Sequence, residues 1–210
     1  RMLAVAALIV GLSGPILNPR SDEPSAGSGP LLIVMDAGWA SADDWRARQT
    51  ALDGLLTRAA RDDRPVAVVR LADPAPVRFL SAEVMRSRVA GLQPVAWAPS
   101  RDRMAEVAAS LPQDAFDTYW MSDGIARDGR EALLSALEER GAVTVVESPR
   151  SLYALRPAAF EDGAVQVSAQ RLRAGPEATI TLTGHGRDPA GNPAVLVRSP
   201  ATFEDGATTA

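Results

Sequence analysis

Residues 31–45 read LLIVMDAGWASADDW, and this stretch decides the fold. Five apolar residues lead directly into Asp36, and a turn of small residues follows before Trp45. An uninterrupted apolar run of this length is typical of a strand that is buried on both faces of a parallel sheet. Open α/β sheets bind their ligands at the carboxyl ends of such strands. Asp36 is therefore the first candidate for a functional residue.

Downstream of this stretch, strand and helix patterns alternate. Trp45, Leu52, Leu55, Leu56 and Ala59 fall on one face of a helix, and Ser41 is placed to cap its beginning. Further helices are expected at residues 79–92, 101–111 and 129–141, and further strands at 65–72, 116–122, 143–147 and 151–155. This alternation predicts an open, mostly parallel sheet with helices on both faces.

The order of the strands can also be predicted. Leu31–Met35 should be central, flanked by Val66–Leu71 and Asp117–Met121, because a wholly apolar strand needs cover on both faces. The strand that reads FDTYWMSDG also ends in an acid, Asp123. Adjacent parallel strands end at the same edge of a sheet, so we expect Asp36 and Asp123 to lie close together there.

The two ends of the chain differ from this α/β region, which we assign to residues 31–157. Residues 158–210 contain short alternating strands separated by Gly, Pro and Asn turns, which predict the start of a β-sandwich domain. Residues 1–17 are uncharged after Arg1 and mostly apolar, and residues 18–30 form a linker rich in Pro, Ser and Gly.

The apolar segment at residues 1–17 predicts a membrane helix that is truncated in this sequence, because a full span needs roughly 20 residues. A signal peptide and a buried soluble helix are the alternatives. Arg1 precedes the segment and the next basic residue is Arg20. By the positive-inside rule, this favours a cytoplasmic start and a soluble part in the periplasm of a bacterium, anchored in the inner membrane.

Composition excludes several classes of function. The formal net charge is −4 and no basic run is present, which argues against nucleic-acid binding. The chain has no cysteine, so disulfides, thiolate metal sites and cysteine nucleophiles are excluded. The only histidine, His185, lies in TGHGRD, and no G-x-S-x-G motif is present, so a serine-hydrolase triad has no support. We therefore predict no catalytic residue in this chain.

Four features together resemble a von Willebrand factor A-type domain over residues 31–155. They are the strand ending in Asp36, the capped helix after it, the helix start in PSRDRMAEVAAS, and the strand closing in WMSDG. The membrane helix, the linker and the order of these motifs are similar to bacterial membrane proteins with an aerotolerance-regulator-type N-terminal double transmembrane domain. That resemblance implies a large envelope protein whose von Willebrand-like part is followed by β domains.

The family resemblance also implies a divalent cation at the sheet edge, but the motif is degenerate here. Asp36 takes the place of the first aspartate, Ser100 that of the threonine, and Asp123 that of the last acid, whereas Gly38 and Ala40 stand where two serines are expected. A hard cation prefers about six oxygen ligands. We therefore expect Mg²⁺ or Ca²⁺ to bind weakly or not at all. Serines restored at positions 38 and 40 should strengthen binding if the site geometry survives.

Three interpretations of Asp36 and Asp123 remain open: a structural role, a weak cation site completed by water, and catalysis. In the structural interpretation, each acid accepts turn amides or pairs with an arginine such as Arg101 or Arg103. Trp39, in the turn beside the acids, is a candidate ligand or partner contact. The predicted function is protein–protein interaction or assembly with other envelope proteins. The alternative is a cation-dependent or small-ligand-dependent binding domain or enzyme that uses the Asp36/Asp123 edge.

Overall fold

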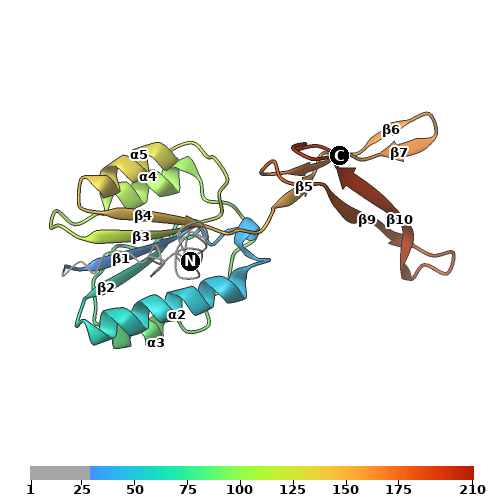
Figure 1. Ribbon diagram of the computed structural model, residues 1–210. Helices are drawn as coiled ribbons and strands as arrows, with labels where there is room; N and C mark the ends of the chain where they lie inside the picture. The colour runs from blue at the N-terminus through green and yellow to red at the C-terminus, as the bar shows by residue number, and fades with distance from the viewer. Residues whose placement is uncertain (1–28) are drawn as a thin grey trace, which may run out of the picture.

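The computed structural model describes residues 29–210, in an α/β part followed by a β-rich part (Figure 1). The predicted membrane helix at residues 1–17, and all but the end of the linker, lie outside the described residues. Within residues 29–210, no helix is both long and apolar enough to cross a bilayer.

The α/β part is built on a parallel sheet with the order β2-β1-β3-β4. These strands are β1 (Leu31–Met35), β2 (Val66–Arg70), β3 (Asp117–Ser122) and β4 (Val143–Glu147). All five residues of β1 are buried, and β1 pairs with β2 on one side and β3 on the other. The prediction of a central β1 with these two neighbours is confirmed.

Helices cover both faces of the sheet, with α2 and α3 on one face and α4 and α5 on the other (Figure 1). Leu31, Ile33 and Met35 of β1 pack toward α2 (Trp45–Arg61) and α3 (Ala82–Val89). Leu32 and Val34 pack on the other side, toward α4 (Arg101–Ala109) and α5 (Arg130–Glu138). This division follows from the two-residue period of a strand, which sends successive side chains to opposite faces.

The beginning of α2 differs from the prediction. A short 3₁₀ helix, η1 (Trp39–Ser41), follows β1, and Asp44 is the residue that precedes α2. Ser41 is fully buried in η1 and makes no cap hydrogen bond, so the prediction that it caps α2 is wrong. The apolar face predicted for this helix is nevertheless correct, since all five of its residues are buried.

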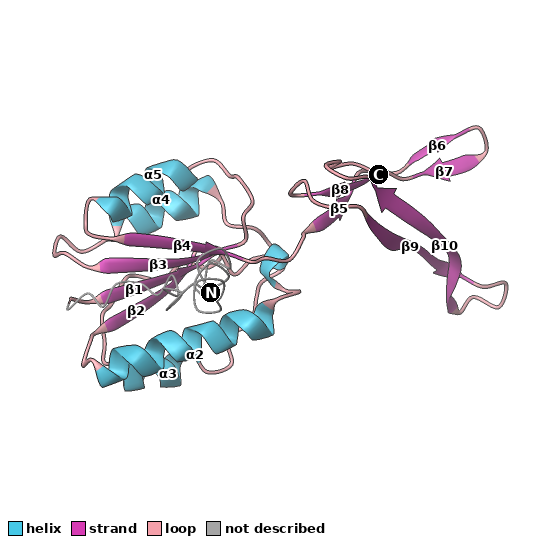
Figure 2. Ribbon diagram, viewed as in Figure 1, coloured by secondary structure: helices cyan, strands magenta, loops and turns pink. Residues whose placement is uncertain are grey.

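The β-rich part contains three antiparallel strand pairs (Figure 2). The pairs are β5 (Tyr153–Leu155) with β8 (Ala169–Arg171), β6 (Ala159–Glu161) with β7 (Ala164–Gln166), and β9 (Ala178–Arg187) with β10 (Pro193–Phe203). The strand expected at residues 151–155 therefore exists, but it belongs to this part and not to the parallel sheet. Among the described residues, the strands form separate pairs and not the two packed sheets of a sandwich.

A buried arginine holds the β-rich part together. The guanidinium group of Arg171 donates hydrogen bonds to the backbone carbonyls of Gly175 (2.7 Å), Pro176 (2.7 Å), Glu204 (3.0 Å) and Ala207 (2.5 Å). It also lies 5.2 Å from the centre of the Phe203 ring. Arg171 thereby ties the loop after β8 to the turn after β10.

Candidate functional site

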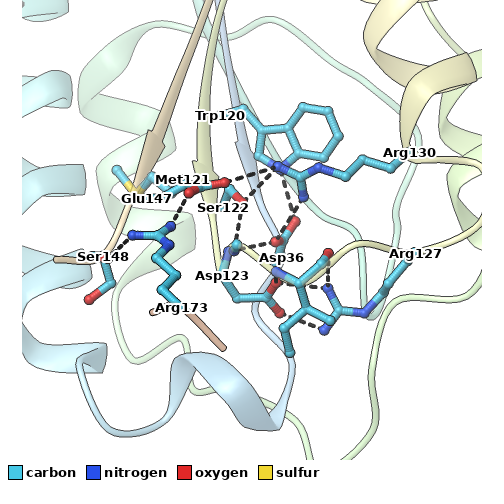
Figure 3. Close-up of polar contacts among 12 residues, drawn as sticks. Asp36, Trp120, Met121, Ser122, Asp123, Arg127, Arg130, Glu147, Ser148 and Arg173 are labelled. Carbon is cyan, nitrogen blue, oxygen red and sulfur yellow. Dashed lines mark hydrogen bonds and ion pairs between the residues drawn. The ribbon is translucent and has the colours of Figure 1, made fainter. Parts of the chain in front are cut away.

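Asp36 lies at the carboxyl edge of the sheet, where both of its carboxylate oxygens accept hydrogen bonds from β3 and its end (Figure 3). The indole Nε1 of Trp120 donates to Oδ1 at 2.8 Å, and the backbone N–H of Asp123 donates to Oδ2 at 2.7 Å. The side chain of Asp36 has no exposed surface. The structure thus brings Asp36 and Asp123 together, as the strand order predicts.

Arg130, the first residue of α5, extends over this pair (Figure 3). Its Nη1 lies 3.6 Å from Oδ2 of Asp36, and its Nη2 donates to the Ser122 hydroxyl at 2.7 Å. The guanidinium carbon is 4.5 Å from the centre of the Trp120 ring, a favourable cation–π distance. Arg130 therefore supplies positive charge to a carboxylate that water does not reach.

Asp123 is held by a second arginine, Arg127. Nη1 and Nη2 of Arg127 donate to the two carboxylate oxygens of Asp123, each at 2.7 Å, which is the bidentate geometry of strong arginine–carboxylate pairs. The backbone N–H of Ile125 also donates to Oδ1, at 3.0 Å. Each acid thus accepts a turn amide and faces an arginine, as expected. The arginines are Arg127 and Arg130, however, and not Arg101 or Arg103; Nη1 of Arg103 lies 3.9 Å from Oδ1 of Asp73 instead.

The two carboxyl groups have pKa values shifted in opposite directions. Burial, followed by the nearby charge of Asp123, raises the pKa of Asp36 from 3.8 to about 6, although the hydrogen bonds from Trp120 and the Asp123 amide oppose the shift. Burial also acts to raise the pKa of Asp123, but the hydrogen bonds from Arg127 and Ile125 outweigh it and lower that pKa. Asp123 is therefore the ionised member of the pair at pH 5, while Asp36 is largely protonated.

A further buried arginine at this edge was not anticipated from the sequence. Arg48 of α2 donates to the carbonyls of Met121 (3.1 Å) and Ser122 (3.0 Å), and to Asp44 Oδ1 (2.7 Å). It fixes the end of β3 from the opposite side to Arg130. The sequence does contain a signal for it, because Arg48 lies three residues after Trp45 on the otherwise apolar face of α2.

Gly38 is required by packing, which changes how the degenerate motif is understood. A Cβ atom at position 38 would lie 2.7 Å from the Trp97 carbonyl oxygen, 3.3 Å from Ala98 Cα and 3.2 Å from Pro99 Cδ. The backbone of residues 97–99 therefore occupies the space that a serine side chain would need. The expectation that serines at positions 38 and 40 strengthen cation binding requires the geometry of the edge to survive, and a serine at position 38 fits only if this backbone is displaced.

The remaining cation ligand suggested by the family resemblance, Ser100, serves as a helix cap. Its Oγ accepts the backbone N–H of Arg103 at 3.3 Å at the beginning of α4. Within residues 29–210, no group of three or more His, Cys, Asp or Glu side chains is arranged to hold a metal ion. The donors around Asp36 and Asp123 do not fit a divalent cation either, since N–H groups already face their oxygens.

Trp39 lies at the junction of the α/β and β-rich parts. Its side chain is 44% exposed and lines a cavity of about 440 Å³ with Ile125 of the α/β part and Leu152, Ala154 and Leu172 of the β-rich part. The same junction includes an ion pair between Glu147 and Arg173. Trp39 is thus the candidate residue at this edge that remains accessible to a partner.

Glu147 joins the junction to the acid pair. Its second oxygen lies 3.9 Å from Nη2 of Arg130, so one carboxylate contacts both the arginine above Asp36 and the arginine of the β-rich part (Figure 3).

Comparisons with protein-family models, with curated proteins and with solved structures found no match.

Proposed function

We propose that this chain is part of a membrane-anchored protein of the bacterial cell envelope. In this proposal, residues 1–17 belong to a helix in the inner membrane, and the parts that follow lie in the periplasm. The α/β part is a von Willebrand factor A-like domain that serves protein–protein interaction or assembly and carries out no catalysis. The parallel sheet with two acids at its carboxyl edge is compatible with that family.

One observation carries the choice of an interaction role over a cation-dependent one. Each acid at the sheet edge is already bound by donors of the protein itself: Asp36 by Trp120 and the Asp123 amide, and Asp123 by both arms of Arg127. A cation would have to displace these donors and would meet the guanidinium groups of Arg127 and Arg130. Donors that are already fixed in this way favour a rigid binding surface, and Trp39 is an exposed aromatic residue beside it.

Calorimetry tests the cation-independent part of the proposal. Titration of Mg²⁺ or Ca²⁺ into the full chain should give no stoichiometric binding below about millimolar concentration, because too few oxygens are free to meet the preference for about six. The matched variant is Asp123→Asn, which removes one charge from the edge. Tight one-to-one binding by the native chain, lost in this variant, would overturn the proposal in favour of the cation-dependent alternative.

Photocross-linking in cells tests the interaction role. A photoreactive phenylalanine analogue at position 39 should form discrete adducts with other envelope proteins, and chelation of divalent cations should not change them. The control is the same analogue at Val84, a residue of α3 with 47% exposure, close to that of Trp39. Equal labelling at both positions, or adducts that vanish on chelation, would contradict the proposal.

Reporter fusions test the location. A reporter that is active only in the periplasm should be active when fused after Pro30, and one that is active only in the cytoplasm should not. The opposite result would exclude a periplasmic α/β part while leaving its interaction role open to the cross-linking test.

A further inference from the structure

The β-rich part contains one short motif twice. Residues 156–167 read RPAAFEDGAVQV and residues 199–210 read SPATFEDGATTA, so both carry Pro-Ala, one further residue, and then Phe-Glu-Asp-Gly-Ala. The glycine of each copy has a left-handed backbone, with φ of +80° at Gly163 and +74° at Gly206. In each copy the alanine also lies opposite the glutamate across the turn: Glu161 pairs with Ala164, and the Ala207 N–H donates to the Glu204 carbonyl at 3.0 Å.

The two copies lie in opposite environments. Phe203 of the second copy has no exposed surface, whereas 74% of Phe160 in the first copy is exposed. Phe203 packs against the Tyr153 ring at a centroid distance of 5.5 Å and beneath the guanidinium group of Arg171. We call Tyr153 and Arg171, which are directly paired across β5 and β8, the cradle.

The cradle recognises atoms that both copies possess. Arg171 donates to the carbonyls of Glu204 and Ala207, and the N–H of Gly206 donates to the Gly175 carbonyl at 2.9 Å. The equivalent residues of the first copy, Glu161, Ala164 and Gly163, are identical in type. The main-chain donors and acceptors that the cradle uses are therefore present in the first copy as well. Its turn now differs in one respect, because Asp162 has a left-handed backbone (φ +51°) and the equivalent Asp205 does not.

The residues that follow the motif in the second copy are also held by backbone contacts. Residues 208–210 lie along β8 through backbone hydrogen bonds: Arg171 N–H to Thr208 O (3.0 Å), and a reciprocal pair between Ala169 and Ala210 (2.8 and 2.9 Å). Backbone contacts do not depend on side-chain identity, so Val165–Val167 could make them as well once the β6–β7 pairing, which now engages Val165 and Gln166, has opened. Thr208 faces the cavity lined by Trp39 and Leu172, where the equivalent Val165 would present an apolar side chain to apolar neighbours.

We propose that the cradle is a binding site for Phe-Glu-Asp-Gly-Ala segments, and that it accepts Phe160–Ala164 of a second copy of this chain in place of its own Phe203–Ala207. The exchange covers Phe160 and Val165, two of the most exposed large apolar side chains among the described residues. The cradle already binds this sequence within one chain, so the exchange needs no new kind of contact. Its cost is the release of the resident Phe203 segment and the opening of the β6–β7 hairpin. This proposal depends neither on the membrane anchor nor on the role of the sheet edge.

The test uses full chains with two different affinity tags, purified together in a non-ionic detergent. Native copies should co-purify, and Phe160→Ala in both copies should abolish this, because the segment loses its ring. Phe160 is exposed, so the substitution leaves the core intact. The control is Leu196→Ala, which removes another exposed side chain (62%) outside the motif and should leave co-purification unchanged.

A second variant should strengthen binding of the first-copy segment, whereas Phe160→Ala should abolish it. Phe203→Ala weakens the resident segment, so this chain should bind a labelled peptide of residues 156–167 at least tenfold more tightly than the native chain does, by fluorescence anisotropy. A peptide of residues 199–210 should bind to the same site and compete. The double variant Phe203→Ala with Arg171→Gln should lose the peptide.

Several results would overturn the proposal. They are native copies that do not associate, association that survives Phe160→Ala, and a folded Phe203→Ala chain that ignores both peptides. If Phe203→Ala fails to fold, the co-purification of native and Phe160→Ala chains still decides the question.

Discussion

Asp36 shows how a single buried carboxyl group can be stabilised and yet remain difficult to ionise. Trp120 and the Asp123 amide each donate to one of its two oxygens, and Nη1 of Arg130 lies 3.6 Å from Oδ2. Loss of water and the neighbouring charge of Asp123 nevertheless raise its pKa to about 6. Ionised Asp36 is therefore a cost to the folded state, and this cost has a measurable dependence on pH.

We expect the stability of the chain to fall between about pH 4 and pH 6 as Asp36 loses its proton. Its pKa is higher in the folded state, about 6, than the ordinary value of 3.8, so the folded state holds the extra proton in this range and is favoured at the lower pH. The contribution lost across the range is on the order of 3 kcal/mol, at 1.36 kcal/mol per pKa unit. Urea unfolding at half-unit steps of pH measures it.

The control is Asp36→Asn, which cannot titrate, so its curve should lack this decline. The lowered pKa of Asp123 acts in the opposite direction: its contribution is present above about pH 4 and is lost as the pH falls further. Native and Asp36→Asn curves that run parallel from pH 4 to pH 6 would show that Asp36 ionises without penalty.

At the scale of elements, the apolar periodicity predicts the strands and helices well, because burial on one or two faces determines it. β1 is buried at every position and central, as its five apolar residues require. The partners of short strands are harder to predict. Residues 153–155 form a strand, but three residues carry too little pattern to decide between the parallel sheet and the β8 edge.

The sequence predicts the position of the two acids but not the residues that contact them. Strand order brings Asp36 and Asp123 together without knowledge of their surroundings. The choice of Arg127 and Arg130 over Arg101 and Arg103 depends on where the loop before α5 places each side chain, and sequence spacing does not contain that information. The contact of Gly38 with residues 97–99 is likewise a long-range approach of two backbones.

Gly38→Ser should destabilise the chain by about 1–3 kcal/mol, the usual cost of forcing extra atoms into a packed region. Its Cβ would stand 2.7 Å from the Trp97 carbonyl, and a backbone oxygen cannot move away without displacing the segment before α4. Ala40→Ser, two residues along in η1, is the matched control and should change the free energy of unfolding by less than about 0.5 kcal/mol. Denaturant unfolding with and without Mg²⁺ measures both. A stable Gly38→Ser chain that gains further stability from Mg²⁺ would instead support a vestigial cation site that serine can repair.

At the scale of the whole molecule, the two parts meet through a small number of polar and apolar contacts. The junction contains the Glu147–Arg173 pair, a hydrogen bond from Arg173 to the Ser148 carbonyl, and the cavity beside Trp39. Glu147 and Arg173 are both partly exposed, so their ion pair contributes little to stability. The α/β part has its own two-sided core, whereas the β-rich part depends on the cradle around Phe203.

Arg171→Lys should therefore loosen the β-rich part and leave the parallel sheet unaffected. A lysine ammonium has three donors on one atom and cannot reproduce a planar guanidinium that contacts four separate carbonyls. A hydrogen bond from a charged donor contributes about 1.5–3 kcal/mol, and lysine cannot keep all four, so a loss on the order of 3 kcal/mol is expected in this part. Hydrogen exchange read by mass spectrometry should accelerate at Ala169, Arg171 and Ala210, whose amides pair β8 with residues 208–210, and remain slow in β1.

Arg187→Lys is the matched control, because the exposed Arg187 donates to a single carbonyl, that of Gly191. Faster exchange in β1 of the Arg171→Lys chain would mean that the two parts unfold as one unit, and that the junction at Trp39 and Glu147 couples them more strongly than its contacts indicate.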